Sequence, residues 1–189
     1  MKLFGAVAVL AAAMEAWAGD AVKASKRAVM VCMNPGANAS IAFRGQATAA
    51  QILTQAGIQL NWRSGESACA QGIGIVITVS RDTPFKQHPG ALAYAQPFDR
   101  TRIVLFYDRV LNTASSAVAP TLLGHVLAHE IVHVLQGCDR HSTSGVMKPH
   151  WDKPDYEDMR RAPLPLTQED LVLIDRGLEW RAARLAPVE

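Results

Sequence analysis

The sequence predicts an α+β fold in which a twisted, mixed five-stranded sheet packs against helices. Two observations lead to this prediction. Short apolar runs rich in β-branched residues alternate with longer segments of helical periodicity along the 189 residues. The composition, 49% hydrophobic and 19% charged, is that of a globular domain, and no repeat or Ser/Gly-rich linker divides the chain. We therefore expect one folded domain over residues 19–189.

Each predicted strand is a short apolar segment bounded by turn-forming residues. The first, 28–33, reads AVMVCM and ends before an Asn-Pro-Gly turn. Apolar alternation or a β-branched run predicts four more, at 58–62, 74–79, 91–95 and 103–107. A helix over 46–56 separates the first two strands, because apolar residues recur there at helical spacing up to Gly57, a residue suited to a helix end.

Two long helices are predicted in the C-terminal half. Residues 120–136 have a helical pattern, with Pro120 in the first turn and Gly137 at the position of a left-handed cap. The following segment, 138–165, is rich in proline and predicts an irregular loop. The last helix is expected to open at Thr167, whose hydroxyl can cap it, and to run to about residue 185.

Residues 1–18 have the pattern of a secretory signal peptide: Lys2, an apolar run, and Ala16 and Ala18 around the expected cleavage site. The mature protein is therefore expected to be secreted or periplasmic. Thiols tend to oxidise outside the cytosol, and the expected arrangement joins Cys32 to Cys69 and leaves Cys138 free. Sequence alone does not fix this pairing.

Charge and hydropathy exclude two classes of protein. The formal net charge is +2 and no run of like charges occurs, so a nucleic-acid partner is not expected. No apolar stretch reaches the roughly 18–20 residues of a spanning helix, so a membrane protein is not expected either.

The segment His129-Glu130-Ile131-Val132-His133 carries the chemistry. Residues four apart share one face of a helix, so the two imidazoles can converge on one metal ion. Zinc suits such ligands, and Glu130 is placed to take a proton from a water at the metal. Apolar neighbours predict that this helix is buried, where two histidines and a glutamate without partners would be destabilising.

A third zinc ligand is expected shortly after the helix, where Gly137 permits a sharp turn. His141 is the first choice and Asp139 the alternative. Cys138 is less suitable, because a thiolate gives zinc a softer and more closed site.

The segments HEIVHVLQGCDRH (129–141) and SGVMKP (144–149) resemble the metzincin zinc peptidases, especially the matrixin-like branch. The resemblance implies that His129, His133 and His141 bind Zn²⁺ and that Glu130 is the general base. It also implies that Gly137 is the turn glycine and Met147 the residue of the Met-turn. Relative to the family pattern Gly137 is one residue late and His141 two, and Asp139 stands where the third ligand would be counted. The predicted order of strands and helices is similar to the metzincin layout.

We expect a monomeric, secreted zinc metalloendopeptidase acting on a peptide or protein substrate. Residues Ala91, Leu92, Ala93, Tyr94 and Ala95 are the expected substrate-binding segment, because a strand of small residues suits an exposed edge that an extended peptide can join; an interior strand is the alternative. Two other functions remain open, a zinc hydrolase of a non-peptide amide and a secreted zinc-binding module without catalysis. His125 is expected to be a hydrogen-bonded helix residue, His88 and His150 to be solvated, and Tyr156 to stay away from the reaction centre.

Overall fold

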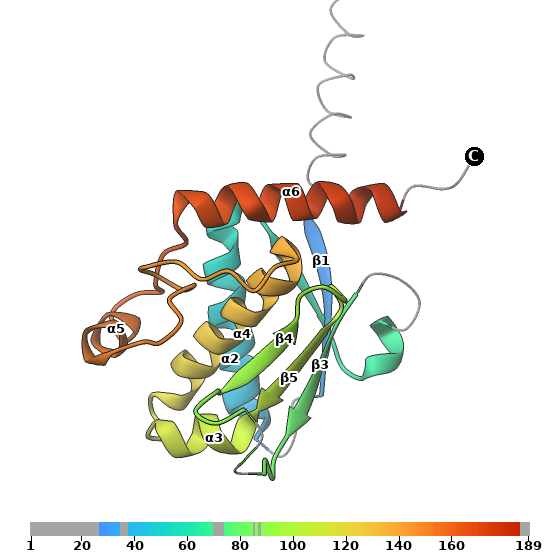
Figure 1. The fold of residues 1–189 in the computed structure, drawn as a ribbon. Coiled ribbons are helices and arrows are strands. Elements are labelled where there is room, and N and C mark those ends of the chain that lie inside the picture. Colours follow the sequence, from blue (N-terminus) through green and yellow to red (C-terminus); the bar gives the residue numbers. More distant parts are fainter. Residues whose placement is uncertain (1–26, 35–37, 70–73, 85, 87, 186–189) are drawn as a thin grey trace, which may run out of the picture.

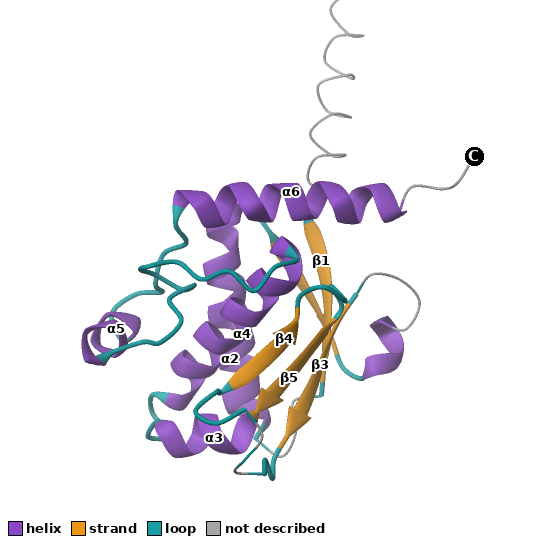
Figure 2. Ribbon diagram, viewed as in Figure 1, coloured by secondary structure: helices purple, strands orange, loops and turns teal. Residues whose placement is uncertain are grey.

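The computed structural model describes residues 27–34, 38–69, 74–84, 86 and 88–185. The predicted signal peptide, residues 1–18, lies outside this part of the chain. Five strands form one mixed sheet, in the order β2-β1-β3-β5-β4 (Figures 1 and 2). Their bounds are β1 Ala28–Met33, β2 Gln59–Arg63, β3 Ile75–Ser80, β4 Ala93–Gln96 and β5 Arg102–Phe106.

All five predicted strands are present, each within two residues of its expected bounds. β1 pairs with β2 and β3, and β3 with β5, in parallel. β4 pairs antiparallel with β5 alone and is therefore an edge strand. The expectation of an exposed edge near residues 91–95 is confirmed, although the strand begins at Ala93 and leaves Ala91 and Leu92 in the preceding loop.

The helices are α2 Ala39–Leu53, α3 Tyr107–Thr113, α4 Ala119–Gln136, α5 Lys153–Met159 and α6 Gln168–Leu185, with short 3₁₀ turns at Thr54–Ala56 and Glu66–Cys69. α4 and α6 match the predicted helices, and Thr167 caps α6 as expected through a bond from the Asp170 N–H to its hydroxyl at 3.2 Å. α6 lies across one end of the sheet, and α2 and α4 run side by side along one face (Figure 1).

Two predictions about the helices were wrong. The first helix begins seven residues earlier than expected, at Ala39, because the Asn38 side chain caps it there. Gly45 lies within this helix, and its backbone packs closely against Leu123 of α4. The segment 138–165 is not wholly irregular, since it contains α5. Pro154 lies in the first turn of that helix, where a proline does not break the hydrogen-bond pattern.

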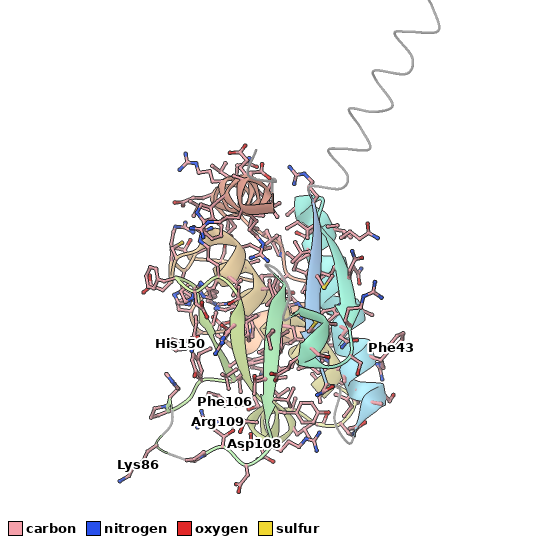
Figure 3. All side chains as sticks on the ribbon, turned by 90° about the vertical axis from the view of Figure 1, so that its right-hand side faces the viewer. Phe43, Lys86, Phe106, Asp108, Arg109 and His150 are labelled. Carbon is pink, nitrogen blue, oxygen red and sulfur yellow. A yellow bond between two sulfur atoms is a disulfide. The ribbon has the colours of Figure 1, made fainter. Side chains whose placement is uncertain are left out.

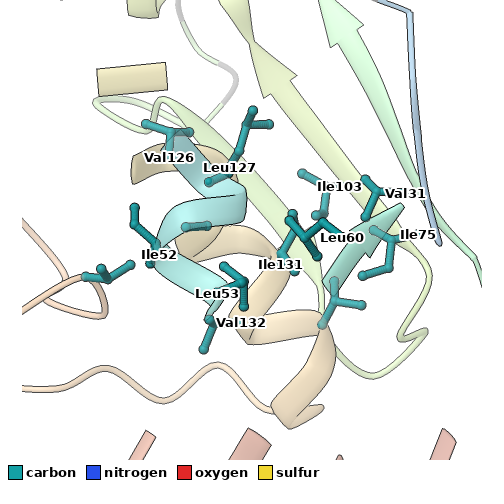
Figure 4. Packing of buried hydrophobic residues seen from close by; sticks show 14 of the residues in the cluster. Val31, Ile52, Leu53, Leu60, Ile75, Ile103, Val126, Leu127, Ile131 and Val132 are labelled. Atoms are coloured by element: carbon teal, nitrogen blue, oxygen red, sulfur yellow. The ribbon is translucent and has the colours of Figure 1, made fainter. Parts of the chain in front are cut away.

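The core lies between the sheet and helices α2 and α4 (Figure 4). Val31, Ile75 and Ile103 project from the sheet and have at most 1% exposure. Leu127 and Ile131 of α4 belong to the same buried cluster and are fully buried. Burial of a side chain of this size contributes about 1.5–3 kcal/mol. This packing holds α4, the helix with the histidines, rigidly against the sheet.

Two glycines let α2 and α4 approach closely. A Cβ on Gly45 would lie 2.7 Å from the Leu123 side chain, and one on Gly124 would overlap Thr48. Neither helix could keep this position with a larger residue at these sites. The glycines therefore fix the distance between α2 and α4.

A disulfide joins Cys32 on β1 to Cys69, and Cys138 is free, as the sequence predicted. The disulfide attaches the 3₁₀ turn Glu66–Cys69 to the sheet. No helix in the described part of the chain is both long and apolar enough to cross a membrane.

Candidate metal centre

A cleft of about 460 Å³ lies between the edge strand and the loop that follows α4. One wall is Ala91, Leu92, Ala93, Tyr94 and Ala95, the segment predicted to bind substrate. The floor is α4, with His129, Glu130 and His133. The opposite wall includes His141, Trp151 and Tyr156. The cleft thus brings together residues from four separate parts of the chain.

His129 and His133 lie one turn apart on α4 and are at most 9% exposed. The Nδ1 atom of His129 bonds to the carbonyl oxygen of Val146 at 2.8 Å, and Nδ1 of His133 to that of Cys138 at 3.1 Å. Their Nε2 atoms are 3.0 Å apart. Burial and the nearby His133 lower the pKa of His129 to about 3, and burial lowers that of His133 to about 4. Both rings are therefore neutral at pH 7.

The hydrogen bonds at Nδ1 determine where each ring carries its proton. A carbonyl oxygen can only accept, so Nδ1 of each neutral ring must donate, and Nε2 is then a lone-pair acceptor. The 3.0 Å approach of the two Nε2 atoms is consequently not a hydrogen bond. Two acceptors this close repel each other unless a cation lies between them. The pair therefore fits a metal ion that takes imidazole nitrogen, and the carbonyl bonds orient both rings toward it.

His141 completes a cluster of three imidazoles. Its ring centroid lies 5.2 Å from that of His129 and 4.8 Å from that of His133. One ligand atom from each ring lies within 4.8 Å of the others, and this is the one group of potential metal ligands found in the described part of the chain. His141 is exposed, as a ligand on the open side of a cleft would be. Asp139 lines the cleft but is not a member of this group.

The loop that carries His141 is attached to α6. Arg140 donates to the Asp170 carboxylate at 3.1 Å and also pairs with Glu169. Ser142 donates to the same Asp170 carboxylate at 2.7 Å. The residues on both sides of His141 are therefore fixed to a side chain that has no solvent exposure. Sequence reasoning missed this anchor; the one signal that could have found it is the Thr-x-x-Asp capping pattern at Thr167.

Gly137 and Met147, which the resemblance implied to be the turn glycine and the residue of a Met-turn, both lie in turns of the chain. Gly137 caps α4 with a φ of 70°, and its N–H bonds to the His133 carbonyl at 2.8 Å. A Cβ at Gly137 would overlap the Arg100 guanidinium. Met147 is fully buried, and its carbonyl accepts from the Ser142 N–H at 2.8 Å. The turn between Ser142 and Met147 brings the Val146 carbonyl to His129.

Glu130 faces the cleft beside the imidazoles and is 8% exposed. Burial raises its pKa to about 8, and a hydrogen bond from the Ala95 backbone opposes this rise. With a pKa near neutrality, the carboxyl group can both accept and return a proton.

The remaining polar residues have different environments. His125 is hydrogen-bonded as expected, from its Nδ1 to the Thr121 carbonyl at 2.8 Å and from the Leu164 N–H to its Nε2 at 3.1 Å. His88 and His150 are exposed, also as expected.

The wall opposite the edge strand is more aromatic than the sequence indicated. Trp151, which sequence reasoning missed, lies edge-on to His129 with centroids 5.7 Å apart. Tyr156 lines the cleft, whereas the sequence led us to expect it elsewhere. Burial raises the pKa of Tyr156, so it is protonated at pH 7. Neither residue has a local sequence signal, because α5 and its preceding loop bring them to the cleft.

No protein-family model matches the sequence, and a search of curated proteins finds no match. Among solved structures the fold is similar to that of archaemetzincin from Methanopyrus kandleri. The two chains are 14% identical, with a TM-score of 0.48. The similarity covers 80% of this chain and 94% of that chain.

Proposed function

We propose that this protein is a zinc-dependent metalloendopeptidase of the metzincin type. The observation that carries the proposal is the pair of Nε2 atoms of His129 and His133, 3.0 Å apart and both without a proton. His141 lies beside them, and a buried glutamate faces the same cleft.

His129, His133 and His141 would hold the zinc ion. Three imidazole ligands leave one coordination position open, as in catalytic rather than structural zinc sites. When bound, zinc supplies Lewis-acid chemistry, which lowers the pKa of water in the site to about 7 and polarises a substrate carbonyl. The cluster favours His141 over Asp139 as the third ligand.

Glu130 would act as the general base. It takes one proton from the attacking water, whose oxygen forms a bond to the scissile carbonyl carbon. When the C–N bond breaks, Glu130 returns that proton to the departing amine nitrogen. The raised pKa of Glu130 and its position beside the imidazoles support this role.

The edge strand β4 would bind the substrate backbone. The Phe106 N–H donates to the Leu92 carbonyl at 2.9 Å, so in the antiparallel register the even-numbered residues of β4 bond to β5. The backbone groups of Ala93 and Ala95 therefore project toward the open edge. An extended peptide laid along this edge would pass Glu130 and the imidazoles.

Export is part of the same proposal. The disulfide between Cys32 and Cys69 is typical of an oxidising compartment. The signal-peptide pattern of residues 1–18 supports secretion into such a compartment. A monomer remains our expectation.

The test is a digest of a peptide library by the purified mature protein, with and without phenanthroline, alongside Glu130→Gln. We expect about one zinc per chain in both proteins by elemental analysis, and loss of about 10²–10⁴-fold in kcat for the variant. Hydrolysis that survives in Glu130→Gln would contradict the proposal. Zinc without peptide cleavage would indicate a non-peptide amide substrate, or a binding module if no amide is cleaved.

The third ligand is tested separately by zinc content. His141→Ala is expected to lower zinc affinity, whereas Asp139→Ala is expected to retain the metal. The opposite result would assign the ligand to Asp139.

A further inference from the structure

Between β3 and the edge strand the structure describes residues 81–84, 86 and 88–92, and two neighbouring residues of α3 bind this segment. Asp108 accepts hydrogen bonds from the Thr83 N–H at 3.1 Å and the Thr83 hydroxyl at 2.7 Å. Arg109 donates to carbonyl oxygens further along the loop. Figure 3 shows Asp108 and Arg109 close to Phe106 near one end of the sheet, with Lys86 further out on the loop.

Arg109 brings the carbonyl groups of Pro84, His88 and Ala91 together on one guanidinium. Its Nη1 donates to His88 at 2.7 Å and to Ala91 at 2.9 Å, and its Nη2 donates to Pro84 at 3.1 Å. The guanidinium also lies over the Phe106 ring, 4.6 Å from its centroid. Hydrogen bonds from a charged donor are stronger than neutral ones. One side chain therefore defines the path of the loop just before β4.

His88 connects this guanidinium to the edge strand. Its φ of 43° lies in the left-handed region, which is unfavourable for a residue with a Cβ. The bond from Arg109 holds the His88 carbonyl, and the His88 ring stacks on Tyr94 with centroids 4.3 Å apart. Tyr94 is a β4 residue whose strand partner is Val104. Without Arg109 the His88 carbonyl would lose this hydrogen bond, and the stacking of His88 on Tyr94 of β4 would be weakened.

The end of the loop that Arg109 binds is also the end that forms the cleft. Ala91, whose carbonyl Arg109 binds, lines the cleft, and β4 begins two residues later. Asp108 instead holds Thr83, ten residues before Ala93. Asp108 thus restrains only the end of this segment near β3, whereas Arg109, which binds the Pro84, His88 and Ala91 carbonyls, also restrains the end that adjoins the edge strand.

We propose that Arg109 is a positioning residue for substrates that are extended peptides. It fixes the open edge of β4, where Ala93 and Ala95 present their backbone groups, so that a peptide of several residues can pair with the strand. A substrate too short to reach this edge does not depend on Arg109. This inference rests on the proposed peptidase function and names its substrate class.

The test compares Arg109→Met, which removes the donors, with Arg109→Lys, which keeps the charge. Asp108→Ala is the matched control, because Asp108 binds only the end of the segment near β3. Circular dichroism and zinc content establish that each variant is folded. If Arg109→Met does not fold, Arg109→Lys takes its place in both measurements below.

The first measurement is backbone hydrogen exchange over residues 88–96, which needs neither zinc nor activity. Arg109→Met is expected to exchange about tenfold faster there than the parent protein, with Arg109→Lys between them. Asp108→Ala is expected to change exchange near Thr83 only. Unchanged exchange over 88–96 in the Arg109 variants would overturn the proposal.

The second measurement is steady-state kinetics with a peptide of about eight residues and with a blocked dipeptide amide. Arg109→Met is expected to raise KM for the long peptide about tenfold, with kcat changed by less than about twofold. For the short substrate, kcat/KM of Arg109→Met is expected to stay near the parent value. For Asp108→Ala, kcat and KM for both substrates are expected to stay near the parent values. Equal effects on both substrates, or an equal effect of Asp108→Ala, would reject a role in positioning. If the parent cleaves neither substrate, the proposed function fails, and exchange alone then decides whether Arg109 holds the edge.

Discussion

Asp170 links the stability of this fold to its candidate metal centre, and Asp170→Ala tests that link. Its fully buried carboxylate accepts from Arg140 at 3.1 Å and from Ser142 at 2.7 Å. It also accepts from the N–H and the hydroxyl of Thr167, at 2.9 and 2.6 Å. The variant loses all four hydrogen bonds at once.

The expected destabilisation follows from these contacts. Removing one partner of a buried, hydrogen-bonded ion pair costs about 3–5 kcal/mol. For a domain of this size each kcal/mol lowers Tm by about 2–4 °C, so a fall of roughly 6–20 °C is expected. Because Arg140 and Ser142 flank His141, zinc affinity is expected to fall about tenfold or more as well.

The assay is thermal unfolding at fixed zinc concentration, together with a zinc titration. Asp175→Ala is the matched control on the same helix, because Asp175 forms a half-exposed pair with Arg27 at 2.9 Å. Such a surface pair contributes at most about 1 kcal/mol. A destabilisation of Asp170→Ala no larger than that of Asp175→Ala would refute the reasoning. Unchanged zinc affinity would show that the hydrogen bonds of Asp170 do not position the metal ligands.

The contribution of Asp170 also depends on pH. Its burial alone would raise the pKa of Asp170, but hydrogen bonds from Thr167, Ser142 and Arg140 outweigh that effect and lower the pKa below its ordinary value. Because the folded-state pKa is lowered, the stabilisation is fully present above the unfolded pKa of about 3.9. It is lost as pH falls through the folded pKa. The stability difference between the parent and Asp170→Ala should therefore be constant from pH 5 to 7 and narrow below about pH 4; a difference that does not narrow would contradict this.

Three further predictions concern the helix cap, the disulfide and the metal. Gly137→Ala places a Cβ at a φ of 70° and against Arg100, so urea unfolding should show a loss of about 2 kcal/mol or more; a neutral result would mean that the turn adjusts freely. Replacing Cys32 and Cys69 together by Ser opens a crosslink between positions 37 residues apart, with an expected loss of about 4 kcal/mol, and reduction of the parent should reproduce it. Removal of zinc by a chelator should lower Tm, and restoring zinc at about 100 times its Kd should regain about 2.7 kcal/mol; a Tm independent of zinc would argue against a metal centre.

Sequence patterns predicted the parts of the fold that depend on local periodicity. The five strands and the helix with His129 and His133 follow from short-range apolar spacing. The helix α3 was missed because the apolar run Ile103 to Tyr107 continues across the junction at which β5 ends and α3 begins. The start of α2 was missed because Phe43 is 73% exposed and Gly45 faces α4, so the apolar period is absent there.

In the candidate site too, only the residues that share one helix could be predicted from local spacing. His129, Glu130 and His133 share one helix, so their spacing alone brings them together. His141 and Asp139 could not be separated by spacing, because the loop is placed by bonds from Arg140 to α6, far along the chain. Trp151 lies in a loop fixed by turn hydrogen bonds, such as that from its own Nε1 to the Gly145 carbonyl, and these leave no periodic pattern in the sequence.

The hydrogen bond from Arg109 to the Ala91 carbonyl limits how far a chain added to β4 can pair. Ala93 and Ala95 present their backbone groups at the open edge, whereas the Ala91 carbonyl is already engaged. The ladder between β4 and an incoming strand should therefore be short, covering Ala93 and Ala95 and ending before Ala91.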